Sequence, residues 1–377
     1  MKILVLTKRF YTGRDLLSDR YGRMWELPYF LAESGHEVRG FALSYRATEE
    51  MHLEREGGMN LGWQSMSIGL LPGIGLFRYW QEVKSCISDF KPDLIWAGSD
   101  VFHVIMGARL GSIFGVQVVA DLYDNYESFS ATRLLPGAGW LFRRSLVSVT
   151  GISCVSGILA RKIANQLPTE PKITVVENGV DPESFRPMSK ATCRHRLGLP
   201  KEGWLVGVAG ALSASRGIAV LGDACLLLQQ EGVPVHLVVA GPRDRNFHPP
   251  MSGEGFDLGI LAHKDVPLFI NALDVVVIAN IDSEFGRYCF PVKLYETMAC
   301  GVPLVAASVG AVAELFSDEQ YCLFQPGDID GLARVIKAQL YGPARPNLPV
   351  SSWREMAHKL EAFLEDVVAS SPMSKSE

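Results

Sequence analysis

Short apolar runs alternate with segments of helical periodicity along the whole chain. In the first half, apolar runs at residues 3–6 and 38–43 flank a polar loop and an amphipathic segment over 22–34. Further apolar runs follow near residues 94–96, 116–121, 151–155 and 173–176. Strands that alternate with helices in this way are typical of parallel α/β sheets. The pattern predicts one doubly wound domain in the first half.

A turn-rich segment without periodicity separates this domain from a second alternation. It contains Asn178-Gly179-Val180-Asp181-Pro182 and then Phe185-Arg186-Pro187. The second alternation predicts strands near 204–209, 235–240, 274–278, 304–306 and 321–324, with helices over 217–230, 292–300 and 328–341. We therefore predict an α/β protein of two Rossmann-like, doubly wound domains facing each other across a cleft. We place the domains at 1–186 and 187–350, with a last helix and a tail over 351–377.

Composition narrows the function classes. The chain has 377 residues, 48% of them hydrophobic, which is enough for two domains with cores of their own. The first residues run into Thr7-Lys8-Arg9 and lack the apolar stretch of a signal peptide. Residues 145–160 are too rich in Ser, Thr and Gly to span a bilayer. The seven cysteines form no CxxC pair, which is typical of reduced thiols. We expect a cytoplasmic protein without a metal or other cofactor.

The charges are unevenly divided between the two halves. Residues 1–197 carry 23 basic and 20 acidic side chains, a net charge of +3, whereas the remaining residues carry 13 and 21, a net charge of −8. This division favours an acidic surface such as a phospholipid headgroup near the first half. It gives no support to nucleic-acid binding.

The most informative stretch is the predicted helix that follows Phe290. Pro291 suits the first turn of a helix, and Gly301 and Pro303 end it before a strand. The backbone amides at the start of a helix can hold a phosphate without a metal. Here these are the amides before Leu294, in the turn that also contains Pro291 and Val292. Lys293 lies in this first turn, where the helix dipole disfavours a cation, so a bound anion would explain it. Glu296 follows one turn later and can accept hydrogen bonds from ribose hydroxyls. The alternative is a surface Lys–Glu pair on an ordinary helix.

A second signal is the loop over residues 207–217. It leaves a predicted strand, passes Gly210 and other small residues that let a ligand approach the backbone, and delivers Arg216 just before a helix start. Arg216 could bind a diphosphate through two hydrogen bonds. The alternative is an ordinary loop that ends in a solvated arginine.

Taken together, these motifs resemble the retaining glycosyltransferases of family 4, and the resemblance covers almost the whole chain in the family's order. The similar segments are Gly35-His36-Glu37-Val38, Lys91-Pro92-Asp93-Leu94, Val155-Ser156, Asn178-Gly179-Val180-Asp181, Arg216-Gly217 and the helix from Lys293 to Gly301. The Pro-x-Lys-Leu-x-Glu variant is familiar from bacterial polysaccharide and lipopolysaccharide transferases. The resemblance implies the GT-B fold, with the last helix crossing back to the first domain.

The resemblance also implies a reaction. A UDP- or GDP-sugar would donate its sugar, with retention, to a hydroxyl acceptor such as a glycan or a lipid-linked molecule. Glu296 would hold the ribose, while Arg216, Lys293 and the helix-start amides neutralise the departing diphosphate. Asp124 and its neighbour Tyr123 would contact the acceptor or the transferred sugar, and Gly22 would lie on the same side of the site. Of these residues, Arg216, Lys293 and Asp124 are the expected catalytic ones.

The chain departs from the family pattern at three positions. Many members carry a glutamate eight residues before the one aligned with Glu296, but Tyr288 stands there, and Glu284 lies twelve before it. Either a longer loop brings Glu284 to the place of the missing first glutamate, or the role of that glutamate is lost. Ala211 replaces a frequent arginine, and Tyr123 aligns with a frequent histidine.

Other constellations carry less chemistry. Asp328-Ile329-Asp330 imitates a metal motif but opens a predicted helix after Pro326-Gly327, so we interpret it as a cap. We interpret His103 and His263 as structural. There is no GxGxxG after the first strand, which argues against a dinucleotide-dependent dehydrogenase. Two alternatives remain open: a GT-B nucleotide-sugar epimerase, and a non-catalytic nucleotide-sugar-binding subunit.

Two apolar, arginine-bearing segments suggest where the protein works. Residues 69–80 and 133–144 each combine Leu, Phe and Trp with arginine after a Pro-Gly loop, a mixture suited to the interface of an anionic membrane. The alternative is that the aromatics belong to the core of two ordinary helices. We expect peripheral contact at the inner face of the plasma membrane.

Overall fold

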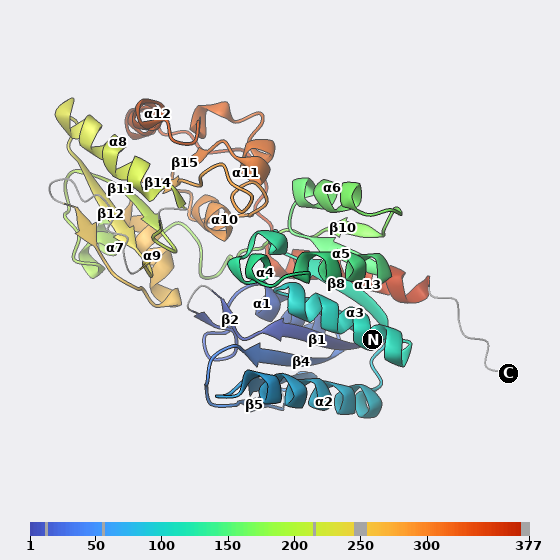
Figure 1. Ribbon diagram of the computed structural model, residues 1–377. Coiled ribbons are helices and arrows are strands. Elements are labelled where there is room, and N and C mark those ends of the chain that lie inside the picture. The colour runs from blue at the N-terminus through green and yellow to red at the C-terminus, as the bar shows by residue number, and fades with distance from the viewer. Residues whose placement is uncertain (12–13, 55–56, 214–215, 245–254, 371–377) are drawn as a thin grey trace. The chain divides into compact units, whose positions relative to one another are not determined.

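A computed structural model describes residues 1–11, 14–54, 57–213, 216–244 and 255–370 of the protein. The chain forms two compact units, each a parallel sheet with helices (Figure 1). Unit 1 comprises residues 1–178 and the chain from Trp353 onward, and unit 2 comprises Gly179–Ser352. The domain boundaries at 186 and 350 remain predictions, whereas the compact units divide at 178 and 352.

Unit 1 is built on an eight-stranded sheet in the order β10-β9-β8-β7-β1-β4-β6-β5. Its neighbouring strands pair in parallel except for β5, which pairs antiparallel with β6. The strands are β1 (Lys2–Lys8), β4 (Glu37–Ser44), β5 (His52–Leu53), β6 (Leu61–Ser67), β7 (Leu94–Gly98), β8 (Gln117–Leu122), β9 (Gly151–Cys154) and β10 (Ile173–Val175). A separate two-stranded hairpin joins β2 (Phe10–Tyr11) to β3 (Arg14–Asp15).

Helices pack on the sheet of unit 1 and divide its buried side chains into two cores. One core joins α1 (Arg23–Glu33) and α13 (Trp353–Ala369) to the sheet. The other joins α2 (Pro72–Phe90) and α3 (Val101–Phe114) to the sheet. The remaining helices are α4 (Ser130–Leu134), α5 (Ala138–Ser148), which packs on α3, and α6 (Gly157–Gln166). The C-terminal helix α13 thus completes the core of unit 1 by packing against α1.

Unit 2 is built on a six-stranded, all-parallel sheet in the order β13-β12-β11-β14-β15-β16. The strands are β11 (Trp204–Ala209), β12 (Val235–Ala240), β13 (Phe256–Asp257), β14 (Val275–Ile278), β15 (Leu304–Ala307) and β16 (Leu323–Phe324). The helices are α7 (Lys190–Arg196), α8 (Ile218–Gln230), α9 (Val266–Ala272), α10 (Val292–Ala299), α11 (Gly310–Leu315) and α12 (Ile329–Tyr341). The core of this unit joins α8 and α12 to the sheet.

The strand order of each sheet reverses at one point. In unit 1 the chain adds strands outward on one side of β1 and then returns to pair β7 on its other side. In unit 2 the same reversal lies between β11 and β14. Open parallel sheets bind ligands outside the carboxyl ends of the strands at such a reversal. Each unit therefore has one favoured place for a ligand.

The sequence pattern missed several elements. Strand β6 was not predicted because Gly62, Gln64 and Ser65 dilute its apolar positions, although most of its residues are buried. The short helices α7, α9 and α11 were not predicted either, since none exceeds two turns. The predicted strand over 321–324 begins as a 3₁₀ turn, Gln320–Cys322, and only Leu323–Phe324 pairs. Ala214 and Ser215, which belong to the predicted loop over residues 207–217, lie outside the described residues.

None of the helices in the described part of the chain is both long and apolar enough to cross a membrane.

Candidate functional site

The loop after β11 lies against the loop after β14 at the reversal point of unit 2. Gly210 and Gly217 both have positive φ angles, +132° and +67°. A side chain at Gly217 would place its Cβ 2.4 Å from the carbonyl oxygen of Ala279, which follows β14. Only glycine permits this approach of the two backbones without strain. The contact holds Arg216, the preceding residue, at the carboxyl edge of the sheet.

Arg216 contacts the segment that leads into α10. Its guanidinium carbon lies 4.6 Å from the centre of the Phe285 ring, a cation–π distance, and a guanidinium nitrogen lies 3.9 Å from the sulfur of Cys289. Within the described residues no carboxylate forms an ion pair with Arg216. Its positive charge is therefore available to an anionic ligand.

Helix α10 begins where the sequence placed it. Pro291 is its N-cap residue, with extended φ and ψ and no side-chain cap. The Leu294 amide donates to the Pro291 carbonyl at 3.0 Å, and the Leu294 side chain is fully buried. For the Val292 amide, no partner is found among the described residues. Val292 therefore offers the helix-start donor, while Leu294 stabilises the turn.

Lys293 and Glu296 form a direct ion pair on α10. Nζ of Lys293 lies 2.5 Å from Oε2 of Glu296, and the Glu296 side chain is 3% exposed against 23% for Lys293. The alternative of a surface Lys–Glu pair is therefore wrong for Glu296, because its carboxylate is buried. A buried carboxylate held by a lysine is a fixed acceptor at the base of the first turn.

Glu284 is on the exposed loop before α10. Its side chain is 50% exposed and lies 3.7 Å from Arg287 in an ion pair. Arg287 also binds Asp282 through two nitrogens, and this hydrogen bonding lowers the pKa of the Asp282 carboxyl. A role for Glu284 in donor binding remains a prediction.

In unit 1, Gly22 serves the start of helix α1. It is the N-cap residue, with φ at +82°, and the helix then presents Arg23 to the sheet. The buried Arg23 donates to both oxygens of the buried Asp121, at 2.9 and 2.7 Å, and to the carbonyl of Val176 at 2.6 Å. Ser153 also donates to Asp121, at 2.6 Å. Gly22 therefore fixes a buried ion pair at the end of β8.

Tyr123 and Asp124 follow this ion pair along the chain. The hydroxyl of Tyr123 donates to the carbonyl of Ser99 at 3.1 Å, and burial raises its pKa well above the usual value. The ring lies 5.7 Å from that of Tyr11. Tyr123 is thus a neutral group already committed to one backbone acceptor. Burial lowers the pKa of Lys8, and the Asp124 carboxylate lies close enough to that lysine to oppose this shift.

Sequence reasoning missed two residues at the reversal point of unit 1. Ser99, which follows β7, is fully buried with φ at +82°, a conformation that costs a non-glycine residue about 1–3 kcal/mol. Lys8, the last residue of β1, is partly buried beside it. The positive φ of Ser99 leaves no mark in the sequence, and Thr7-Lys8-Arg9 resembles an ordinary polar strand end. Strained backbone of this kind collects at functional sites.

Two of the residues predicted to be structural or capping, Asp328 and His103, can be checked directly. Asp328 caps α12 by accepting from the Gly331 amide at 2.9 Å, as predicted. His103 is buried, and its Nδ1 lies 2.8 Å from Asp100, the N-cap residue of α3. Among the described residues one group could hold a metal ion, His36 with Glu361 and Glu365 on α13. This group lies away from the predicted site residues, and Nε2 of His36 already pairs with Glu361 at 2.7 Å.

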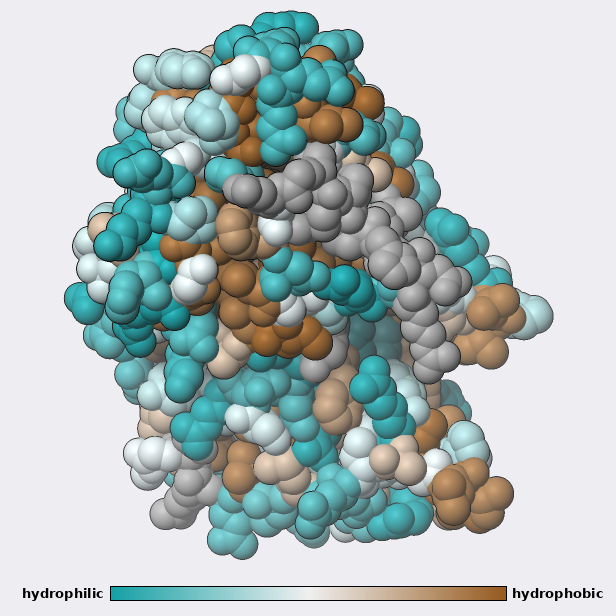
Figure 2. All heavy atoms as spheres, turned by 90° about the vertical axis from the view of Figure 1, so that its left-hand side faces the viewer, coloured by the Kyte–Doolittle hydropathy of each residue, from teal (hydrophilic) through white to brown (hydrophobic). Residues whose placement is uncertain are grey.

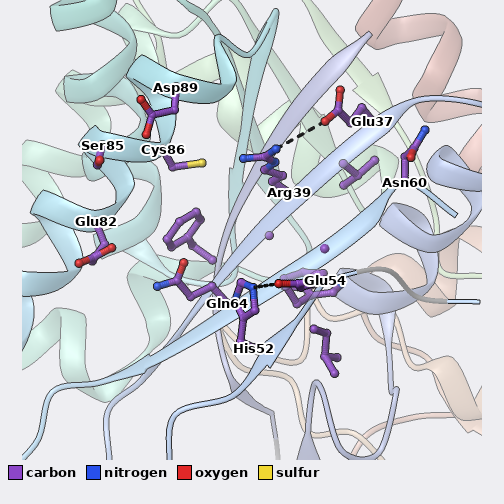
Figure 3. Close-up of a pocket in the computed structure, with 16 residues that line it drawn as sticks. Glu37, Arg39, His52, Glu54, Asn60, Gln64, Glu82, Ser85, Cys86 and Asp89 are labelled. Atoms are coloured by element: carbon purple, nitrogen blue, oxygen red, sulfur yellow. Dashed lines mark ion pairs between the residues drawn. The ribbon is translucent and has the colours of Figure 1, made fainter. Parts of the chain in front are cut away.

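A pocket of about 480 Å³ opens at the amino ends of β4 and β6, beside α2 (Figure 3). Figure 3 shows Arg39 pointing toward Cys86 and Asp89 of α2. Carboxylates dominate the lining, with Glu37, Glu54, Glu82 and Asp89 against Arg39 and His52. A diphosphate would be repelled here. The pocket also lies at the opposite ends of the strands from the reversal point, so it does not serve the predicted donor.

The two apolar segments of unit 1 expose much of their hydrophobic surface. Leu70 is 92% exposed and Leu134 79% exposed. The other large exposed side chains of these segments are Leu71, Ile74, Phe77, Leu135, Trp140 and Leu141. Tyr79 and Phe142, in contrast, are buried in the core. Figure 2, which labels no residue, shows the left-hand side of Figure 1, where hydrophobic side chains reach the surface among mostly hydrophilic ones. The core interpretation therefore holds for Tyr79 and Phe142, whereas contact of the exposed side chains with a membrane remains a prediction.

Two family models match the chain, one in each unit. The model described as Glycosyltransferase Family 4 matches residues 24–184, and the model described as Glycosyl transferases group 1 matches residues 204–340. Unit 1 thus contains a family 4 glycosyltransferase domain and unit 2 a group 1 glycosyltransferase domain, and the resemblance seen in the sequence motifs is confirmed.

Solved structures support the same fold. A sucrose-phosphate synthase from Thermosynechococcus elongatus superposes with a TM-score of 0.80 at 17% identity, covering 98% of this chain and 100% of that one. HepE from Anabaena, solved with UDP and glucose, superposes with a TM-score of 0.68 at 20% identity, covering 98% and 100%. The predicted GT-B fold of two Rossmann-like domains is confirmed.

Curated relatives match part of the chain. The D-inositol 3-phosphate glycosyltransferase of Saccharomonospora viridis is 30% identical over 225 residues, which cover 52% of this chain and 51% of that protein. The 2-deoxystreptamine glucosyltransferase of Streptomyces kanamyceticus is 26% identical over 217 residues, which cover 54% of each. The chain thus matches about half the length of these relatives.

Proposed function

We propose that this protein transfers a sugar from a nucleotide-diphosphate sugar to a hydroxyl acceptor with retention of anomeric configuration. The proposal rests on one observation: Arg216 contacts the segment that leads into α10, at the reversal point of unit 2. The two loops that touch at Gly217 bring there a guanidinium with no carboxylate partner among the described residues, the Val292 amide and Lys293. A diphosphate is the ligand that such a set favours.

The chemistry follows from where charge grows. As the glycosidic bond to the diphosphate lengthens, negative charge collects on the leaving oxygen. Arg216 and Lys293 would stabilise it more in the transition state than in the bound donor. The sugar acquires oxocarbenium character, and the acceptor hydroxyl attacks from the face that the diphosphate leaves while its proton passes to the departing diphosphate oxygen. Glu296 would hold the ribose hydroxyls, and no enzyme nucleophile is required.

UDP is the nucleotide to test first, because the solved HepE was crystallised with UDP and glucose. The named relatives act on a cyclitol phosphate and an aminocyclitol. We therefore propose a ring polyol, a glycan or a glycolipid as the acceptor, in the synthesis of a cell-surface polysaccharide or glycolipid. An epimerase would need two acid–base carboxylates, but Glu296 is bound to Lys293 and Glu284 to Arg287. This arrangement favours transfer over epimerisation.

The test is an assay for released nucleotide. The protein is incubated with UDP-glucose or GDP-mannose, with myo-inositol, D-inositol 3-phosphate or a lipid extract, in EDTA. We expect release of the nucleoside diphosphate and a product whose anomeric proton, followed by NMR, keeps the donor's configuration. An inverted product would contradict retention, and loss of activity in EDTA restored by a divalent ion would contradict a metal-free site. Isomerised donor sugar without transfer would establish the epimerase instead.

We further propose that unit 1 docks on anionic membranes through the two exposed apolar segments. Arginines lie beside the exposed Leu, Phe and Trp side chains, and the guanidinium of Arg144 stacks over Trp140 at 5.7 Å. Aromatic and aliphatic side chains of this kind insert at the headgroup level, and each nearby cation contributes about 1 kcal/mol with anionic lipid. Peripheral docking at the inner face of the plasma membrane would bring a lipid-linked acceptor to unit 1.

Co-sedimentation with vesicles tests the docking. Binding to vesicles of phosphatidylglycerol and phosphatidylcholine should fall with added salt and in the double variant Arg133→Glu with Arg144→Glu. Arg334→Glu, a surface charge change on α12 of unit 2, is the matched control and should bind like the wild type. If wild-type protein stays in the supernatant at low salt, the acceptor is soluble and the docking proposal is wrong.

A further inference from the structure

Lys8 stands at the reversal point of unit 1 in an unusual environment. Its ammonium lies 5.1 Å from the centre of the Tyr11 ring and 5.3 Å from that of Phe129. In the described part of the chain, the ammonium forms no hydrogen bond and no ion pair. Burial lowers the pKa of Lys8, while the carboxylates of Asp100 and Asp124 oppose this shift.

An ammonium carries three hydrogen-bond donors and no acceptor. The two aromatic rings attract its charge but offer no oxygen to these donors. Lys8 is partly buried, so these donors must find oxygen acceptors either in water or in a bound ligand. An oxygen-bearing ligand at this position would complete the environment of Lys8.

The backbone around Lys8 is held rigidly. The Lys8 amide donates to Oγ of Ser99 at 2.8 Å. The Ser99 amide in turn donates to the Tyr126 hydroxyl at 2.8 Å, and its carbonyl accepts from Tyr123. These three hydrogen bonds hold Ser99 at its positive φ and tie the ends of β1, β7 and β8 together. The ammonium is therefore presented at a fixed place.

The neighbouring carboxylates decide which oxygen suits Lys8. Asp100 is already engaged, because it accepts from His103 and from the Tyr45 hydroxyl at 2.9 Å. One cation with two carboxylates gives no excess of positive charge, so a phosphate or carboxylate ligand is disfavoured. A hydroxyl can accept from Lys8 and donate to Asp124 at the same time.

We propose that Lys8 binds a neutral hydroxyl group of the acceptor, with Asp124 as the partner that accepts the hydroxyl proton in a hydrogen bond. Unit 1 thereby selects a ring polyol, a sugar or a cyclitol, over an anionic group at this position. The inference rests on the proposed glycosyl transfer, since it names the class of acceptor group that unit 1 holds. Lys8 acts as a substrate-binding residue whose loss affects the acceptor and not the donor.

The experiment is an NMR titration of protein labelled with 13C at the lysine ε-carbon. The Lys8 signal is assigned as the one missing from Lys8→Arg. In the presence of saturating UDP, myo-inositol, glucose and inorganic phosphate are added separately. We expect a saturable shift of the Lys8 signal with myo-inositol or glucose and none with phosphate. The dissociation constant should rise at least tenfold in Asp124→Asn, while Lys84→Arg, a change on α2, leaves it unaltered.

The outcomes separate the inference from the proposed function. A saturable shift with phosphate alone, or no shift with any of the three probes while UDP still binds, overturns the role of Lys8 and leaves glycosyl transfer intact. Failure to bind either UDP or GDP overturns the proposed function. With the polyol that gives the shift as acceptor, Lys8→Met should raise its KM at least tenfold with the donor KM unchanged, and Lys8→Arg should restore part of the loss. An equal effect of Lys8→Met on both KM values would indicate a structural role.

Discussion

In both units the strand order of the sheet reverses once, but the two reversal points carry different side chains. In unit 2 the reversal point offers cations and a helix start, framed by glycines that let two loops touch. In unit 1 it offers tyrosine hydroxyls, carboxylates and one lysine around Ser99, which is hydrogen-bonded to Tyr123, Tyr126 and the Lys8 amide. The difference matches two kinds of ligand, an anionic diphosphate in unit 2 and a neutral polyol in unit 1. The fold determines where a ligand binds, and the residues of the loops determine which ligand it is.

Each unit also contains one buried arginine–aspartate pair, and the two pairs lie at opposite edges of their sheets. Arg23 and Asp121 lie at the carboxyl end of β8, directly before Tyr123 and Asp124. Arg194 and Asp274 lie before β14, where Asp274 also accepts from the Leu205 amide at 2.7 Å. The first pair can influence a ligand site, whereas the second supports only the fold.

The largest expected effect comes from breaking these pairs. Asp121→Asn and Asp274→Asn should each lower the free energy of unfolding by about 3–5 kcal/mol, because each leaves a buried arginine without its counter-charge. Urea unfolding measures this loss. Turnover per folded molecule should fall in Asp121→Asn and stay close to the wild-type value in Asp274→Asn. Equal losses of turnover in the two variants would contradict the claim that only the Arg23–Asp121 pair influences a ligand site.

The next effect concerns the cations of unit 2. Arg216→Ala and Lys293→Ala should each lower turnover by roughly one to three orders of magnitude, as expected when a group that stabilises transition-state charge is lost. Steady-state release of nucleoside diphosphate is the measurement. Lys264→Ala, an exposed lysine in the 3₁₀ turn His263–Asp265 of the same unit, is the matched control. Near-normal turnover in both test variants would show that the site is elsewhere.

A smaller effect is expected for the buried carboxylate of α10. Glu296→Gln should raise the donor KM about tenfold, because the amide keeps the shape but loses a charge-assisted hydrogen bond to the ribose and the pairing with Lys293. Initial rates with the donor and the acceptor varied separately distinguish the two KM values. A rise confined to the acceptor KM would assign Glu296 to the other substrate.

The fold was largely predictable because parallel strands and their helices leave strong periodic signals. The exceptions were elements whose signal was diluted or short, such as β6 with Gly62 and Gln64. The α10 site was visible because Pro291, Lys293 and Glu296 lie within six residues and their spacing on a helix is fixed. Unit 1 was less predictable, since Lys8, Ser99 and Asp124 come together only when three strands pair. The positive φ of Ser99 is set by its hydrogen bonds and not by its identity.

The central claim is that unit 2 binds the donor nucleotide while unit 1 binds the acceptor. Calorimetric titration of UDP into the wild type, Lys293→Ala and Lys8→Met tests it most directly. The account predicts binding to the wild type, a loss of at least tenfold in Lys293→Ala, and an unchanged dissociation constant in Lys8→Met. A weaker complex in Lys8→Met than in Lys293→Ala, or no binding of UDP or GDP to the wild type, would contradict it.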